Sequence, residues 1–192
     1  GEDLSRLPAK AAKKLRVGAS DIAECRVVKR SLDARKKNDI HYTCSAAVAL
    51  RAGEDKLISH FAGKDVCAYT EPVYDIPRVE SASRPVVVGF GPAGMFAALV
   101  LARAGARPIV LERGQDALSR KAAVDAFRAG GELDPESNVQ FGEGGAGTFS
   151  DGKLNTGTHD KRVFWVLREF AAHGASENVT YDSKPHTSVP TF

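Results

Sequence analysis

The sequence has few cysteines, and their spacing limits what the chain can be. Its 192 residues include only Cys25, Cys44 and Cys67, which are odd in number, far apart and without a Cys-x-x-Cys pair. This pattern argues against a disulfide framework, a cysteine-based zinc site and a redox-active cysteine pair. It is typical of a reducing compartment, so we expect a cytoplasmic protein.

Net charge and long apolar runs are also scarce. The formal net charge is +3, and 43% of the residues are hydrophobic, which is ordinary for a globular protein. This balance requires neither nucleic acid nor a membrane as a partner, and we expect neither. Residues 1–20 lack the apolar core of a signal peptide. The longest uncharged run, residues 85–102, contains glycine and proline in its middle and is better interpreted as a strand followed by a helix.

Two further kinds of site find little support. The five histidines are dispersed without the spacing of metal ligands, so we predict no metal site. Ser150 lies beside Asp151 and near Lys153, but no Gly-x-Ser-x-Gly motif surrounds it. A hydrolytic nucleophile is therefore not predicted at this serine.

The N-terminal part, residues 1–70, is predicted to form a small α+β domain. Its expected elements are a helix over 4–16, strands over 24–32 and 40–50 joined by a polar turn, a short helix from 53 to about 62, and an edge strand over 66–69. This order is compatible with a ferredoxin-like sandwich that lacks its first strand. Residues 71–84, with several prolines and serines, are predicted to be a linker.

The most informative motif is the glycine-rich loop over residues 89–94. A valine-rich segment, 84–88, precedes it, and an apolar segment, 95–102, follows it. Strand, glycine loop and helix in this order form the first half of a dinucleotide-binding βαβ unit. The sequence therefore predicts an α/β fold for residues 85–192, with a Rossmann-like nucleotide-binding domain.

Each residue type in this loop suits that purpose. Gly89 permits a tight turn, Gly91 lets backbone N–H groups approach a pyrophosphate, and Gly94 lets the helix lie close to the strand. Pro92 and Ala93 would occupy the first helical turn, where the N–H groups have no helical acceptor and proline is tolerated.

A carboxylate is expected at the end of the next strand. The apolar segment 108–111 ends at Glu112. In this position a carboxylate can accept hydrogen bonds from ribose hydroxyls, and it would repel the 2′-phosphate of NADP. Beyond it, helices are predicted over 116–129 and 160–173, the first opened by Asp116 and closed by two glycines.

A second glycine-rich stretch occupies residues 130–158. Six glycines lie between positions 142 and 157, and Phe141, Phe149 and Leu154 accompany them. Because glycine is entropically costly to order, such density indicates a packed loop whose N–H groups face an anion or an aromatic ring system. The alternative is a mobile surface loop, which the apolar residues disfavour.

Taken together, these residues resemble the bacterial FAD-dependent dehydrogenases of unassigned substrate, in the two-dinucleotide-binding flavoprotein class. The resemblance covers nearly the whole chain. It rests on residues 28–37, 89–94, 111–114, 133–140, 184–186 and, most specifically, 141–156.

The resemblance implies a flavoprotein oxidoreductase whose reaction is hydride or electron transfer through FAD. Its FAD pyrophosphate would lie on the 89–94 loop and its adenosine ribose beside Glu112 and Arg113. The second glycine-rich loop would lie beside the flavin or its diphosphate, which makes candidates of Gly144, Gly145, Ala146, Gly147, Thr148, Ser150, Asp151 and Gly152.

The partners that the resemblance implies are a small-molecule substrate and NAD(P)H as electron donor or acceptor. Members of this family are longer, so we expect this chain to correspond to their N-terminal part, with the FAD-binding domain incomplete. No catalytic residue is predicted within it.

Two alternatives stay open. One is an NAD-binding Rossmann enzyme without flavin, which gives the second glycine-rich loop no role. The other is a module that binds nucleic acid or protein through a basic cluster on the N-terminal hairpin, a pattern that more often marks a solvated face. The members of this cluster are Arg26, Lys29, Arg30, Arg35, Lys36 and Lys37.

Overall fold

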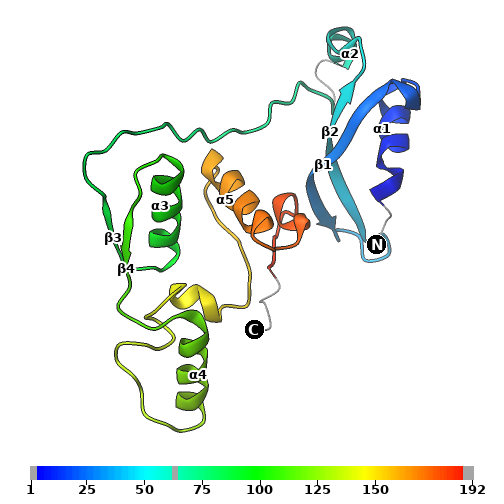
Figure 1. Cartoon of the computed structure of the whole chain (residues 1–192). Coiled ribbons are helices and arrows are strands. Elements are labelled where there is room, and N and C mark those ends of the chain that lie inside the picture. Colours follow the sequence, from blue (N-terminus) through cyan, green and yellow to red (C-terminus); the bar gives the residue numbers. More distant parts are fainter. Residues whose placement is uncertain (1–3, 62–64, 188–192) are drawn as a thin grey trace. The chain divides into compact units, whose positions relative to one another are not determined.

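The structure is a computed structural model that describes residues 4–61 and 65–187 (Figure 1). By their contacts, these residues divide into two compact units. Unit 1 contains the described residues up to Val73 together with Leu154–Thr187, and unit 2 contains Tyr74–Lys153. The boundary at residues 73 and 74 falls within the predicted linker.

Unit 1 is built on an antiparallel hairpin of β1 (Ile22–Asp33) and β2 (His41–Leu50). The register pairs Asp33 with His41 at the turn and Ile22 with Leu50 at the far end. This pairing confirms the predicted hairpin.

Two helices accompany the hairpin. Helix α1 (Leu7–Leu15) follows a 3₁₀ turn at Leu4–Arg6 and ends at Arg16, whose backbone is left-handed with φ 57°. It packs against β1, and its Ala12 is buried. Helix α2 (Glu54–Phe61) follows β2, and Glu54 Oε1 accepts a hydrogen bond from the Leu50 backbone N–H at 2.7 Å. Both predicted helices are confirmed.

The edge strand predicted over residues 66–69 is wrong. Within the described ranges, this segment pairs with no strand, and the sheet of unit 1 has two strands. Side chains hold the segment instead, because the Arg26 guanidinium lies 5.8 Å from the centre of the Tyr69 ring and Arg26 Nη2 donates to Glu71 Oε2 at 2.5 Å. A ferredoxin-like sandwich has four strands, so that prediction is not confirmed.

The segment after residue 153 packs on the hairpin. Helix α5 (Lys161–Ala172) begins at Asp160, whose Oδ1 accepts from the Arg162 N–H at 2.8 Å, and a 3₁₀ turn follows at Glu177–Thr180. The predicted helix over 160–173 is thus confirmed.

The chain then reaches the edge of β1. The Arg30 N–H donates to the Tyr181 carbonyl at 2.7 Å, and the Ser183 N–H donates to the Arg30 carbonyl at 2.9 Å. Arg30 also forms a two-pronged ion pair with Asp182, at 2.6 and 2.8 Å. The sequence predicts Leu154–Thr187 in a domain over residues 85–192, whereas these interactions group the segment with unit 1.

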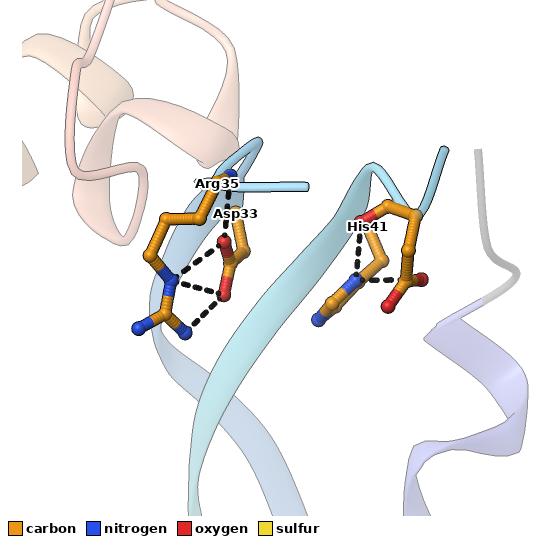
Figure 2. Close-up of polar contacts among 4 residues, drawn as sticks. Asp33, Arg35 and His41 are labelled. Carbon is orange, nitrogen blue, oxygen red and sulfur yellow. Dashed lines mark hydrogen bonds and ion pairs between the residues drawn. The ribbon is translucent and has the colours of Figure 1, made fainter. Parts of the chain in front are cut away.

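The turn of the hairpin carries two local polar pairs (Figure 2). The Arg35 guanidinium and backbone N–H both donate to the Asp33 carboxylate, with Nη2 at 2.6 Å from Oδ2. On the β2 side, His41 Nδ1 lies 3.2 Å from Asp39 Oδ1. The Arg35 side chain, and then its backbone N–H, lower the pKa of Asp33 to about 2.

We expect the Asp33 carboxyl to titrate with a midpoint near pH 2, and Arg35→Met to return it toward the ordinary value of 3.8. Since the folded pKa is depressed, the contribution of this pair is complete above the ordinary pKa and is lost as the pH falls through about 2. NMR titration of the side-chain carboxyl measures both midpoints. Lys36→Met, which removes a neighbouring cation, is the control, and an unchanged midpoint in Arg35→Met would contradict the assignment.

Unit 2 contains a strand–helix–strand unit. Strand β3 (Val86–Val88) pairs in parallel with β4 (Ile109–Leu111), and α3 (Pro92–Arg103) connects them and packs on both. This arrangement confirms the order of elements that the glycine loop predicts. Apolar side chains on the strands remain accessible, since Val88 is 82% exposed.

In the described part of unit 2, the other regular elements are helix α4 (Ala117–Arg128) and a 3₁₀ turn at Gly145–Phe149. Asp116 Oδ1 accepts from the Leu118 and Ser119 N–H groups, both at 3.1 Å, so the predicted helix start is confirmed. Across the described residues, none of the helices has the length and apolar character needed to cross a bilayer.

Candidate functional site

A cavity of about 430 Å³ lies at the carboxyl ends of β3 and β4. Its volume falls within the range of about 300–1,000 Å³ that small-molecule pockets occupy. In α/β sheets, the crevice beyond the carboxyl ends of parallel strands is where ligands bind. The cavity is lined by Val88, Gly89, Gly91, Leu111, Glu112, Arg113, Gln140, Phe141, Gly142 and Gly145.

The first glycine loop contributes Gly89 and Gly91 to the lining of this cavity. The Gly89 N–H donates to the Leu111 carbonyl at 2.7 Å, which extends the β3–β4 ladder by one bond. Gly91 is the N-cap of α3, so the first N–H groups of the helix emerge beside the cavity without acceptors inside the helix. A Cβ on Gly94 would lie 1.9 Å from the Gly89 carbonyl oxygen, so only glycine fits between loop and helix.

Glu112 connects the turns that follow the two strands. Its Oε2 accepts from the Phe90 N–H at 2.6 Å, and its Oε1 accepts from the Gly114 N–H at 2.8 Å. These bonds, from Gly114 first and then from Phe90, lower the pKa of Glu112 below its ordinary value, so the group is ionised at neutral pH. A carboxylate has about four acceptor positions, and the backbone N–H groups around Glu112 do not occupy all of them, so it can also accept from a ligand hydroxyl.

Arg113 and Phe141 form one wall. The Arg113 guanidinium lies 5.1 Å from the centre of the Phe141 ring, and its Nε lies 2.7 Å from Glu136 Oε2. The wall thus combines a cation with a half-exposed aromatic face.

The second glycine-rich loop packs directly on the first. The Gly144 N–H donates to the Phe90 carbonyl at 2.8 Å. Gly145, with φ +60°, approaches Gly91 and Pro92 so closely that a Cβ would lie 3.2 Å from each. Gly142, Gly145 and Gly152 are buried. The packing that the sequence predicts for this loop is present at these glycines.

The structure gathers five of the predicted residues at the cavity: Gly89, Gly91, Glu112, Arg113 and Gly145. Four more, Pro92, Ala93, Gly94 and Gly144, belong to the first turn of α3 or to the loop that covers it but do not line the cavity.

The remaining six predicted residues lie outside the lining. Thr148 Oγ1 donates to the Glu143 carbonyl at 3.1 Å, and Asp151 Oδ2 pairs with Lys153 Nζ at 2.6 Å. The Gly152 N–H donates to Ser150 Oγ at 3.3 Å. Ala146 and Gly147 are exposed members of the 3₁₀ turn.

Sequence reasoning missed Arg120, which has no exposed surface. A signal was present, because Arg120 follows the helix-starting Asp116 by one turn and precedes the buried Val124 by another. Positions four apart share a helix face, so this arginine had to lie on the buried side.

Comparison with known proteins agrees with this geometry. Residues 83–131 match the model of a family described as FAD binding domain. The match supports a flavoprotein. It includes the first glycine loop, Glu112, Arg113 and Arg120. Residues 1–49, in unit 1, match a family described as Domain of unknown function (DUF8436).

A longer relative resembles the whole chain. The chain is 48% identical over 193 residues to an uncharacterized protein of Clostridium beijerinckii. The alignment covers 98% of this chain and 36% of that protein, so the chain spans about a third of the relative's length.

Proposed function

We propose that this chain forms the nucleotide-binding part of an FAD-dependent oxidoreductase of the dehydrogenase type. The observation that carries the proposal is the cavity in which Gly89, Gly91 and Glu112 meet the N-terminus of α3. Such an N-terminus stabilises an anion through free N–H groups and its partial positive charge. The ionised Glu112 carboxylate supplies acceptors for ribose hydroxyls. In this proposal β3, α3 and β4 are the first unit of a Rossmann-like domain in the two-dinucleotide-binding class.

FAD, when bound, would supply the hydride or electron transfer, and the protein would bind and orient it. The 89–94 loop would hold the pyrophosphate, Glu112 and Arg113 the adenosine ribose, and the loop over 144–152 would lie beside the diphosphate or the flavin. A small-molecule substrate, NAD(P)H as electron partner and a cytoplasmic location complete the proposal.

The flavin-free alternative explains less of the site. An NAD-binding enzyme gives no role to the second glycine-rich loop, yet Gly142 and Gly145 line the cavity. The family match over residues 83–131 also favours FAD.

The nucleic-acid alternative loses support because Asp and Glu side chains pair with the three arginines of the basic cluster. Arg26 pairs with Glu71 at 2.5 Å, Arg30 with Asp182 at 2.6 Å, and Arg35 with Asp33 at 2.6 Å. Pairing of this kind offsets the positive potential that a phosphate backbone would need.

The first test is the visible absorption spectrum of the purified chain after incubation with FAD and gel filtration. We expect a flavin band, release of FAD on heating, and an affinity at least about tenfold lower in Gly91→Asp, because a carboxylate would face the pyrophosphate. Gly157→Asp is the matched control, since a Cβ there meets nothing within 4 Å.

Binding of NAD instead of FAD would establish the flavin-free alternative. Equal FAD binding by the wild-type chain and Gly91→Asp would remove the first glycine loop from the site.

A further inference from the structure

Arg120 is a buried cation with an unusual set of partners. It has no exposed surface, and its guanidinium lies 4.9 Å from the centre of the Phe149 ring. The hydrogen-bond acceptors that its side chain contacts are backbone carbonyls and one hydroxyl rather than a carboxylate. Burying a charge is costly unless its hydrogen bonds are satisfied, so this arrangement requires a complete set of acceptors.

The acceptor set is complete. A guanidinium has five N–H donors. Nε donates to the Asn138 carbonyl at 2.8 Å, Nη1 to Thr148 Oγ1 at 3.2 Å and to the Glu143 carbonyl, and Nη2 to the Val139 carbonyl at 2.9 Å and the Gly145 carbonyl at 2.7 Å. Each donor therefore has one acceptor.

These acceptors lie before and after the lining segment 140–142, and one of them, Gly145, itself lines the cavity. Asn138 and Val139 precede the lining residues Gln140, Phe141 and Gly142, and Glu143 directly follows them. One side chain, Arg120, thus binds both ends of the lining segment 140–142. Neighbouring contacts are consistent with this, since Glu143 Oε2 accepts from the Ala117 N–H at 2.8 Å and attaches the loop to the first turn of α4.

The bonds to Arg120 also decide which way the peptide groups of the loop point. In a trans peptide the carbonyl and the following N–H point in opposite directions. Because the Glu143 carbonyl points at Arg120, the Gly144 N–H points away from it, and that N–H donates to the Phe90 carbonyl in the first glycine loop. The same geometry directs the Ala146 N–H away from Arg120, since Arg120 also binds the Gly145 carbonyl.

We propose that Arg120 is a positioning residue for the dinucleotide: by binding the carbonyl oxygens of Asn138, Val139, Glu143 and Gly145, it holds the cavity-lining segment 140–142 and Gly145 in place beside the first glycine loop. This inference rests on the proposed function of the cavity. Arg120 itself does not line the cavity and acts through the loop.

The test compares three forms of the full chain: wild type, Arg120→Lys and Val124→Ala. Lysine keeps the charge but has three donors on a single nitrogen, so it cannot replace all five hydrogen bonds of Arg120. Val124 is fully buried on the same helix, so Val124→Ala is the matched control for loss of packing without loss of the hydrogen bonds.

The first readout needs no cofactor. Amide hydrogen exchange of residues 138–148, measured where each form is folded, should be at least about tenfold faster in Arg120→Lys than in Val124→Ala. Equal exchange in the two variants would overturn the positioning role.

The second readout is FAD affinity by titration. We expect Arg120→Lys to bind FAD at least about tenfold more weakly, and Val124→Ala to remain within about twofold of wild type. Wild-type affinity in Arg120→Lys, or an equal loss in Val124→Ala, would overturn the role in cofactor binding. If the wild-type chain binds no FAD, the proposed function fails and with it the cofactor part of this inference, while hydrogen exchange still decides whether Arg120 holds the loop.

Discussion

Gly94→Ala should destabilise unit 2 strongly and abolish FAD binding, whereas Gly91→Ala should leave its stability nearly unchanged. A Cβ on Gly94 would lie 1.9 Å from the Gly89 carbonyl oxygen and 2.9 Å from the carbonyl carbon. Both atoms are backbone, so no side-chain rotation relieves the clash and α3 must move away from the loop. Overpacking costs about 1–3 kcal/mol in ordinary cores, and we expect at least about 3 kcal/mol here. Denaturant unfolding and FAD titration measure the two effects.

Gly91→Ala is the informative comparison within the same motif. Its Cβ would lie 3.8 Å from the Gly145 Cα, an ordinary contact, and its φ of −74° suits any residue. We expect a change in unfolding free energy within about 0.5 kcal/mol. Gly91 lines the cavity, so the added methyl group would take up space there, and if the cavity holds the dinucleotide, FAD affinity should fall while stability holds.

For Gly94→Ala, the contradicting outcome is a stable variant that binds FAD, which would refute the close approach of helix and loop.

Glu112→Lys should be the second most damaging change. It removes the acceptor of the Phe90 and Gly114 N–H groups and places a cation where the carboxylate now joins two turns. Hydrogen bonds to a charged group contribute about 1.5–3 kcal/mol each, so we expect a loss of about 3 kcal/mol or more, together with loss of FAD binding. Glu112→Gln, which keeps one carbonyl oxygen, should show an intermediate loss. Glu132→Lys, an exposed change of the same charge in the same unit, is the control.

The pH dependence of stability provides an independent check on Glu112. Its folded pKa is lower than the ordinary value of 4.5, chiefly because of the Gly114 and Phe90 N–H groups. Its contribution is therefore complete above the unfolded pKa and is lost as the pH falls through the folded pKa. Unfolding curves measured from pH 6 downward should show wild type losing its advantage over Glu112→Gln in that acidic range. A constant difference between the two proteins would contradict the assignment.

Local chemistry made much of the fold predictable. Asp116 and Asp160 begin helices where their carboxylates can accept N–H groups of the first turn, and both do so. The glycine loop over 89–94 required a strand before it and a helix after it, and β3 and α3 occupy these places. Such features depend on residues within one turn of each other, so the chain carries the information locally.

Contacts between segments far apart in the chain could not be predicted from the sequence. The Val66–Tyr69 segment has the composition of an edge strand, yet it is held by the Arg26 side chain instead of a backbone ladder. Likewise, residues near 182 attach to β1 through Arg30, more than a hundred positions earlier. A partner so distant leaves no periodic pattern in either segment.

The sequence by itself determined the strand–loop–helix–strand unit, the position of Glu112 at the end of its second strand and the packed nature of the second glycine-rich loop. These follow from backbone conformations that few residues other than glycine adopt and from side chains that act on their own turn. The tertiary structure alone decided which loop residues line the cavity, because the loop is held by contacts with distant parts of the chain, among them the five hydrogen bonds of Arg120. Their acceptors lie 18 to 28 positions away, and only folding brings them to one guanidinium.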